Sequence, residues 1–385
     1  AFGVLAGPPP GPVHLEVPHD LFEREVPAPV LVPEPPPPLP APPAALEAAA
    51  RVLAEARHPL LLAGGGVAAA GATAELATLA ERLGAPVITT PMGKGAIPAD
   101  HPLHAGLTWR AVTPDLSGMD TFFTPLTAQA DCLVAVGCRF SQLATGNWRL
   151  PLPSRLVHID ADPAVPGRRY PPTATVVADA RLALAGLLER LPAAPRSPWA
   201  DLTPAPPPTP IPWVVAELRA ALPREAIVAA DITRTGYAML PHFPAYGPRT
   251  FLHSCGFIAM GHAFPAALGA QVAFPERTVV AVAGDGGFLM TAEEMATAVQ
   301  EALPVVAIVM NDGALGGIRL LQEREPGGRP FGVLLRNPDF AAFAQAFGAL
   351  GFTVGKRADF LPALREALAA RRPAVLDVTA PPLET

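Results

Sequence analysis

The sequence predicts an α/β protein made of two doubly wound parallel-sheet domains. From about residue 44 onward, short apolar segments alternate with amphipathic segments, and a proline-rich run divides this alternation into two blocks. Apolar strands that alternate with helices are typical of a parallel sheet covered on both faces. The chain has 385 residues, of which 50% are hydrophobic and 16% charged, and this is enough to build two such domains.

The residues before the first block contain little that could form a core. Residues 1–5 have the composition of a helix, and residues 11–18 are predicted to form a strand that ends at a proline. Eight prolines lie between positions 33 and 43, and such a run favours an extended chain over a packed segment. We therefore interpret residues 26–43 as a proline-rich linker.

Residues 44–191 make up the first block, for which the alternation predicts a Rossmann-like middle domain. A second proline-rich run, residues 192–210, is interpreted as another linker. The elements expected in the first block are a helix at 45–56, a strand at 59–63, a helix at 73–83, strands at 86–90, 132–136 and 156–159, and a helix at 180–191.

Residues 211–385 repeat the alternation and predict the second α/β domain. The elements expected in it are helices at 214–221, 263–273, 292–302, 338–347 and 361–370, and strands at 226–230, 278–283, 305–310 and 374–378.

The composition argues against a nucleic-acid or membrane partner. The formal net charge is −6, and the basic residues form no run longer than a pair, so we expect a small-molecule ligand. The apolar stretches are too short to span a membrane, and no signal peptide opens the chain. Cys132, Cys138 and Cys255 lack metal-binding spacing, which indicates free thiols in a reducing compartment. These observations predict a cytoplasmic protein.

The strongest functional signal is a pair of short motifs at the ends of two predicted strands. Asp285 follows the strand at 278–283 in a Gly-Asp-Gly motif, and Asn311 follows the strand at 305–310 in an Asn-Asp-Gly motif. The carboxyl ends of parallel strands meet at one edge of a sheet, so both residues are expected to face one crevice, from strands that are neighbours or one strand apart. Simple tight turns are the alternative interpretation.

The residue types in these motifs suit a metal ion and an anion. Asp285, Asn311 and the carbonyl of Gly313 offer hard oxygen ligands for Mg²⁺, which completes its octahedron with phosphate oxygens and water. The two glycines after Asp285 leave their N–H groups open to an anion, and a helix expected from about residue 291 points its positive end at the same place. The motifs therefore predict a cradle for Mg²⁺ and a diphosphate.

The spacing of the two motifs resembles the signature of the thiamine-diphosphate enzymes. Residues 259–270, with the sequence AMGHAFPAALGA, are also similar to the cofactor domain of that family. The resemblance implies that Met260 lies under the cofactor and that the Ile258 carbonyl accepts a hydrogen bond from its aminopyrimidine, with a plain core position as the alternative for Met260. The implied cofactor-binding residues are Ile258, Met260, Gly284, Gly286, Gly287, Gly313 and Leu315, and the implied metal ligands are Asp285, Asn311 and Gly313.

The resemblance extends over nearly the whole chain. Residues 92–98, 137–140 and 158–163 are similar to the middle domain of the acetolactate synthase and 2-keto acid decarboxylase group. This implies decarboxylation of a 2-keto acid with carboligation to a second carbonyl, in a homodimer or homotetramer. Residues 1–25 resemble the end of the family's N-terminal pyrimidine-binding domain. Because the activating glutamate is expected in that domain, no catalytic residue is assigned here.

Several alternatives remain at this point. The chain could be a catalytically incomplete cofactor-binding fragment or a subunit that needs a separate pyrimidine-domain chain, or it could be a simple 2-keto acid decarboxylase. A nucleotide enzyme is disfavoured because no GxxxxGK[ST] motif occurs. Arg139 matches a position that supports FAD in relatives, but Ser141-Gln142-Leu143 departs from their charged pattern, so FAD is expected to be absent. The glycines at 64–66 do not fit a dinucleotide-binding motif.

The roles of two histidines and a glutamate near the motifs remain to be assigned, and one pair of leucines disfavours a particular substrate. His253 and His262 flank the cofactor segment and could contact substrate or serve a structural role. Glu294 is expected to cap or pack rather than catalyse. Residues 320–321 are leucines where branched-chain synthases usually carry a tryptophan, which makes standard acetolactate synthesis less favoured.

Overall fold

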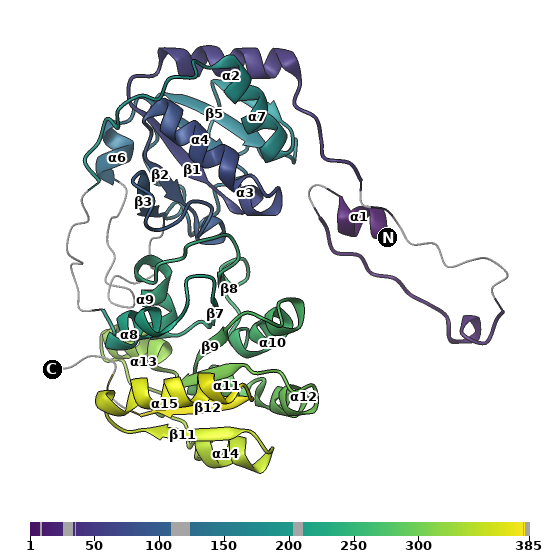
Figure 1. Ribbon diagram of the computed structural model, residues 1–385, viewed down its shortest axis with the longest axis vertical. Coiled ribbons are helices and arrows are strands. Elements are labelled where there is room, and N and C mark those ends of the chain that lie inside the picture. The colour runs from purple at the N-terminus through teal and green to yellow at the C-terminus, as the bar shows by residue number, and fades with distance from the viewer. Residues whose placement is uncertain are drawn as a thin grey trace.

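The computed structural model describes residues 1–7, 10–25, 34, 36–108, 124–202, 211–379 and 381. Two six-stranded parallel sheets, each flanked by helices, form two α/β domains that follow one another along the chain (Figure 1). The predicted fold class is therefore confirmed. The described part of the segment before them contains the helix α1 (Phe2–Ala6) and the 3₁₀ turn η1 (His19–Leu21).

The first sheet has the strand order β3-β2-β1-β4-β5-β6, and its strand pairs are parallel. This is the order of a Rossmann fold. The strands are β1 (Pro59–Ala63), β2 (Val87–Thr89), β3 (His104–Leu107), β4 (Cys132–Val136), β5 (Arg155–Asp160) and β6 (Ala174–Val177). The helices are α2 (Pro43–Glu55), α3 (Gly65–Ala69), α4 (Thr73–Leu83), η2 (Pro91–Gly93), α6 (Thr124–Gln129) and α7 (Ala180–Arg190).

Both faces of the first sheet are buried, because successive residues of a strand point to opposite sides. In β1, Leu61 and Ala63 pack with residues of α2, α4 and α7. Leu60 and Leu62 pack on the other face with a separate cluster that contains Phe140. The fully apolar sequence of β1 follows from this double burial.

The second sheet has the order β11-β12-β10-β9-β7-β8 and is also parallel. Its strands are β7 (Ile227–Ala230), β8 (Phe251–His253), β9 (Val279–Gly284), β10 (Val306–Met310), β11 (Leu350–Val354) and β12 (Ala374–Val378). Its helices are α8 (Trp213–Ala221), α9 (Arg234–His242), α10 (Ala263–Ala273), α11 (Asp285–Leu289), η3 (Ala292–Glu294), α12 (Met295–Gln300), α13 (Gly316–Arg324), α14 (Phe340–Ala346) and α15 (Arg357–Ala370). None of the helices described in either domain has the length and apolar character needed to cross a membrane.

The second sheet is likewise covered on both faces. Val228 and Val280 pack with residues of α8, α9 and α15, whereas Ile227 and Val279 pack with residues of α10, α12 and α14. The helices hold the sheet from both sides, so its carboxyl edge is the place where loops can form a binding site.

One predicted element is wrong, and another is present but interrupted. Residues 11–18 form no strand, because this segment is mostly exposed and pairs with no strand in the described part of the chain. The helix predicted at 292–302 is broken into η3 and α12, and Ala302 has a left-handed φ of 49° where the chain turns toward β10. The domain limits and the two linkers stay predictions, since residues 26–33, 35 and 203–210 lie outside the described residues.

Polar contacts join the two domains. The Lys94 ammonium group, from the first domain, donates a hydrogen bond of 2.6 Å to the carbonyl of Leu240 in α9. Asp100 forms two hydrogen bonds, of 2.6 and 2.8 Å, with the guanidinium of Arg224. Burial lowers the pKa of Lys94 to about 7. The amine is therefore poised to lose its proton near neutral pH.

We expect the Lys94→Met variant to change how stability depends on pH. The unfolded chain keeps a lysine proton up to about pH 10.5, whereas the folded chain releases it near pH 7. Since the unfolded state binds more protons between these values, the free energy of unfolding rises with pH, by up to about 1.4 kcal/mol per unit for one proton. Denaturant titrations at pH 7, 8 and 9 should show this rise in the wild type and a smaller rise in Lys94→Met. An exposed control, Lys356→Met, should keep the wild-type slope; equal slopes in all three proteins would contradict the assignment.

Candidate functional site

The second sheet reverses its direction of growth between β7 and β9. From β7 the chain crosses to β8 on one side, whereas from β9 it crosses to β10 on the other. Connections that leave adjacent strands in opposite directions open a crevice at the carboxyl edge of the sheet, where α/β proteins bind ligands. A cavity of about 480 Å³ lies at this point, a size that suits a small organic ligand.

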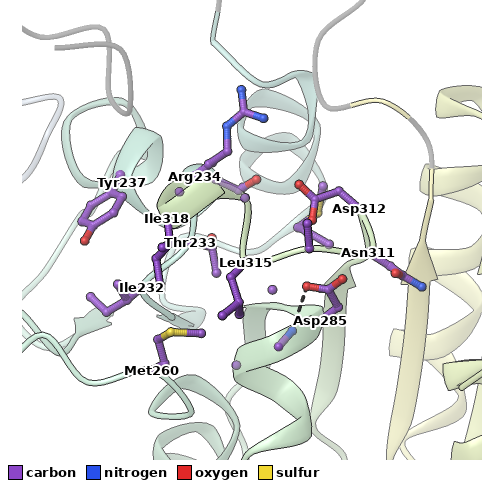
Figure 2. A pocket seen from close by; sticks show the side chains of 18 of the residues that line it. Ile232, Thr233, Arg234, Tyr237, Met260, Asp285, Asn311, Asp312, Leu315 and Ile318 are labelled. Carbon is purple, nitrogen blue, oxygen red and sulfur yellow. Dashed lines mark hydrogen bonds between the residues drawn. The ribbon is translucent and has the colours of Figure 1, made fainter. Parts of the chain in front are cut away.

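The cavity brings together residues from distant parts of the sequence (Figure 2). They come from the segments after β7, β9, β10 and β12 and from the turn before α10. The predicted site residues that line it are Ile258, Met260, Gly284, Asp285, Gly286, Gly287, Asn311 and Leu315. Leu321, one of the two leucines singled out from the sequence, also lines it. Lining residues that the sequence had not indicated include Ile232, Thr233, Arg234, Tyr237 and Ile318.

Asp285 and Asn311 occupy equivalent places on neighbouring strands. Gly284, the last residue of β9, pairs with Met310, the last residue of β10. Asp285 and Asn311 directly follow these two strands, so they leave the sheet side by side. The sequence had left open whether the two strands are neighbours or one strand apart, and in the structure they are neighbours.

The Asp285 carboxylate is only 2% exposed, and hydrogen bonds hold it in one orientation. Its Oδ2 atom accepts hydrogen bonds from the backbone N–H of Gly313 at 2.9 Å and from Nδ2 of Asn337 at 2.6 Å. Its Oδ1 atom accepts from the N–H of Gly286 at 2.7 Å. A buried carboxylate needs such partners, and these fix where its oxygens point.

Gly313 adopts a conformation that favours glycine, with a φ of 67°. This conformation directs its N–H to Asp285. Its carbonyl accepts a hydrogen bond of 2.8 Å from the N–H of Leu335, and one lone pair of that oxygen remains for another partner. Gly313 therefore contacts a predicted metal ligand, although it does not line the cavity.

The glycines after Asp285 pack closely against other side chains. A Cβ atom at Gly286 would lie 2.5 Å from Leu315 Cδ2, and one at Gly287 would lie 2.3 Å from Asp231 Oδ2. A short helix, α11, begins at Asp285 itself and precedes the helical segment expected from about residue 291, which η3 and α12 form. Glycine has a low helix propensity, and here the need for space overrides it.

Asp231 is a buried anchor that the sequence reading missed. It follows β7 and is fully buried. Its carboxylate accepts hydrogen bonds from the N–H groups of Ile232 at 2.9 Å, Gly261 at 2.8 Å and His262 at 3.3 Å. Asp231 thus fixes the Met260 turn against α11.

The turn before α10 presents Ile258 and Met260 to the cavity. Ile258 has a left-handed φ of 60°, which is strained for a β-branched residue, and such strain is concentrated at functional sites. Ser254 holds the turn, since its hydroxyl donates to the Ala259 carbonyl at 2.8 Å. Met260 is half-buried and points toward the cavity (Figure 2). Met260 is therefore not a plain core residue, which was the alternative interpretation of this position.

The charges around the cavity fit a divalent cation together with an anion. Asp285 and Asp312 face it, and Arg234 is the one cationic side chain among the described lining residues. Burial raises the pKa of Asp312, and the neighbouring Asp285 raises it further. A bare diphosphate would be repelled by these carboxylates, so a hard cation between them and the anion would be needed. The side-chain oxygen of Asn337, buried here without a hydrogen-bond partner, also indicates an incomplete polar site.

Other residues singled out from the sequence lie away from this cavity. His253 and His262 are not among its lining residues, and the Nδ1 atom of His253 lies 3.0 Å from Cys255 Sγ. Burial lowers the pKa of His253 to about 3 and raises that of Cys255 to about 12, so this pair stays neutral. Glu294 accepts a hydrogen bond of 2.8 Å from Thr297 in the next turn.

The glycines at 64–66 have a packing role. A Cβ atom at Gly64 would lie 2.0 Å from the Gly137 carbonyl oxygen, and one at Gly66 would lie 2.6 Å from Gly137 Cα. The two backbones therefore touch, which only glycine permits. Arg139, beside this contact, is exposed, and the expected absence of FAD stays a prediction.

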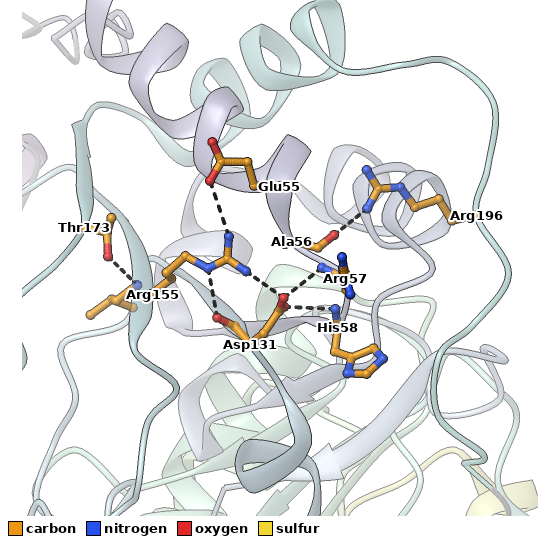
Figure 3. Close-up of polar contacts among 9 residues, drawn as sticks. Glu55, Ala56, Arg57, His58, Asp131, Arg155, Thr173 and Arg196 are labelled. Atoms are coloured by element: carbon orange, nitrogen blue, oxygen red, sulfur yellow. Dashed lines mark hydrogen bonds and ion pairs between the residues drawn. The ribbon is translucent and has the colours of Figure 1, made fainter.

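A polar cluster in the first domain is explained by structure alone (Figure 3). The Asp131 carboxylate accepts hydrogen bonds from the N–H groups of Arg57 and His58, both at 2.9 Å, and from the Arg155 guanidinium at 2.6 Å. These residues stand at the starts of β1, β4 and β5. The cluster aligns the strands at the amino edge of the sheet, opposite the carboxyl edge at which α/β sheets generally bind ligands.

Two family models match the chain. Residues 46–187 match the thiamine pyrophosphate enzyme central domain, and residues 231–378 match the thiamine pyrophosphate enzyme C-terminal TPP binding domain. The first range contains the Rossmann-like sheet, and the second contains most of the residues that line the cavity.

Similar proteins are known from archaea and bacteria. The chain is 33% identical to a probable acetolactate synthase large subunit of Methanocaldococcus jannaschii, over its whole length and 69% of that protein. Over 90% of the chain, it is 37% identical to a probable 2-ketoarginine decarboxylase of Pseudomonas aeruginosa, of which it spans 63%. It is 32% identical to an acetolactate synthase large subunit of Corynebacterium glutamicum, over 96% of the chain and 62% of that protein.

Proposed function

The chain belongs to the thiamine pyrophosphate enzymes, and on that premise we propose that it decarboxylates a 2-keto acid and joins the product to a second carbonyl. The observation that carries the proposal is the pair Asp285 and Asn311, which leave neighbouring strands together at a cavity. Relatives named acetolactate synthase favour carboligation, and a relative named 2-ketoarginine decarboxylase gives simple decarboxylation as the second candidate.

The residues of the cavity fit the parts of thiamine diphosphate. Asp285, Asn311 and the Gly313 carbonyl would hold Mg²⁺, and the glycines at 286 and 287 would give the diphosphate close access to the backbone. When bound, the cofactor supplies the carbanion chemistry that releases CO₂ from a 2-keto acid. The further cofactor contacts would come from Gly284, Leu315, the Ile258 carbonyl and the Met260 side chain.

The rest of the cavity wall would contact the substrate. Ile232, Ile318 and Leu321 provide apolar surface, and Arg234 provides a positive charge. An apolar wall excludes water, which strengthens every charged contact inside the site. These residues suit an anionic keto acid with a small or apolar side chain.

We also propose that the chain works as a homo-oligomer. Phe257, next to the cavity turn, is 91% exposed, and Phe331 is 87% exposed. Large apolar side chains exposed near a binding site are typical of surfaces that another chain covers. A homodimer or homotetramer would bury them.

The test is CO₂ release from a panel of 2-keto acids that carry methyl, ethyl and guanidinopropyl side chains. We expect release to require thiamine diphosphate and Mg²⁺ and to stop with a chelator. Carboligation should yield a 2-hydroxy-3-keto product, seen by NMR, in place of a free aldehyde. Free aldehyde equal to the CO₂ formed would establish the simple decarboxylase, and the absence of both CO₂ release and cofactor binding would refute the proposal.

A further inference from the structure

The structure assigns Asn337 and Asp377 as the positioning residues of the cation site, an inference that rests on the proposed function. Neither residue belongs to the Gly-Asp-Gly or Asn-Asp-Gly motif. Asn337 precedes α14, and Asp377 lies in β12, the neighbour of β10. Both side chains contact Asn311.

A single amide group of Asn337 connects the two proposed side-chain ligands. Its Nδ2 atom lies 2.6 Å from Asp285 Oδ2 and 2.8 Å from Asn311 Oδ1. An amide NH₂ carries two hydrogens, so one can point to each oxygen. Asn311 Oδ1 keeps a lone pair for a cation. Asp285 Oδ2 already accepts two hydrogen bonds, so the carboxylate keeps its lone pair for a cation on Oδ1, which accepts one.

Asp377 determines which end of the Asn311 amide faces the cavity. Its Oδ1 atom accepts a hydrogen bond of 2.9 Å from Asn311 Nδ2, and its Oδ2 atom accepts one of 3.2 Å from the N–H of Phe340. Asp377 is only 5% exposed, so water cannot readily replace these contacts.

The opposite orientation of the Asn311 amide is disfavoured at both ends. It would set the Asn311 NH₂ group against the NH₂ group of Asn337 and the Asn311 oxygen against the Asp377 carboxylate. Asn337 and Asp377 therefore fix Asn311 with its oxygen beside Asp285, as a hard cation requires. Partners that orient a metal ligand in this way commonly change metal affinity by about 10- to 100-fold when they are removed.

The remaining atom of the Asn337 side chain points to the same role. Its Oδ1 atom is buried and has no hydrogen-bond donor. Mg²⁺ in proteins usually keeps several water ligands, and a water on the cation is a hydrogen-bond donor. Such a water would satisfy this oxygen, so Asn337 would contact both the ligands and the hydration shell of the ion.

The experiment measures binding of Mn²⁺, an EPR-active substitute for Mg²⁺, to the chain in the presence of thiamine diphosphate at 25 °C. Asn337→Ala and Asp377→Asn should each weaken Mn²⁺ binding by about 10- to 100-fold, with circular dichroism spectra like that of the wild type. Because both residues act through Asn311, the double variant should lose less than the product of the two single losses. Surface controls, Gln300→Ala and Asp359→Asn, should bind Mn²⁺ like the wild type.

The alternatives give different results. If Asn337 and Asp377 only stabilise the fold, the variants melt at lower temperature but bind Mn²⁺ within about twofold of the wild type at 25 °C, and the inference is overturned. If the wild type itself fails to bind Mn²⁺ with thiamine diphosphate, the proposed function falls and the inference falls with it.

Discussion

Replacing Asp285 with alanine is expected to abolish Mg²⁺-dependent binding of thiamine diphosphate. The variant removes the one carboxylate that the proposal places on the cation. It also leaves the N–H of Gly313 without its acceptor and removes one of the two acceptors of the Asn337 amide. Since loss of a partner behind a ligand already costs about 10- to 100-fold in metal affinity, loss of the ligand should cost more than about 100-fold. Calorimetric titration of the cofactor, with and without Mg²⁺, measures the effect.

The design of this titration separates a site defect from unfolding. Asp285→Asn keeps the size of the side chain and an oxygen, so it should bind more weakly than the wild type but more tightly than Asp285→Ala. Asp359→Ala changes an exposed aspartate on α15 and should have no effect. If folded Asp285→Ala bound the cofactor with Mg²⁺ as tightly as the wild type does, Asp285 would not be a metal ligand.

Asp231→Ala is expected to destabilise the second domain by about 3 kcal/mol or more, because it leaves three backbone N–H groups without an acceptor, and each such group costs about 1–3 kcal/mol when buried. It should also weaken cofactor binding, since Asp231 holds the turn of Met260. Urea denaturation and the same calorimetric titration measure the two effects.

A second aspartate provides the comparison for this variant. Asp179 caps α7 and accepts from the N–H groups of Arg181 and Leu182, so Asp179→Ala should cost only about 1 kcal/mol and leave cofactor binding unchanged. If Asp231→Ala were no more destabilising than Asp179→Ala, the buried anchor would not have the role assigned to it. Asp231→Asn, which retains the shape of the side chain, covers the case in which the alanine variant does not fold.

The central strands could be predicted because both of their faces are buried. β1 and β4 are apolar throughout, β12 is apolar except for the buried Asp377, and the predicted limits of all three match the structure. The edge strand β3 has only one buried residue, and its apolar signal is correspondingly weak. Helix α9 was missed because Gly236 and Pro241 lower its helix propensity, whereas packing of Met239 and Leu240 in the core supplies the stability.

The candidate site could be predicted only where its signal is local. Asp285 and Asn311 each follow a recognisable strand, so one rule about sheet edges placed them together. Asp231 follows a predicted strand in the same way, and that rule would have found it. Asn337 and Asp377 could not be found, because their contacts to Asn311 span 26 and 66 residues of sequence and depend on how distant segments pack.

The strand order of the first sheet delays the pairing of β1 while the chain is being synthesised. β1 is central, yet one of its neighbours, β4, begins about 70 residues after β1 ends. At roughly 5–20 residues per second, a ribosome needs roughly 4–14 s to add that stretch. During this time β1 has an unpaired, fully apolar edge, which is the kind of edge on which chains aggregate. The half-sheet of β1, β2 and β3 is therefore a part of the nascent chain that chaperone binding would protect until β4 is made.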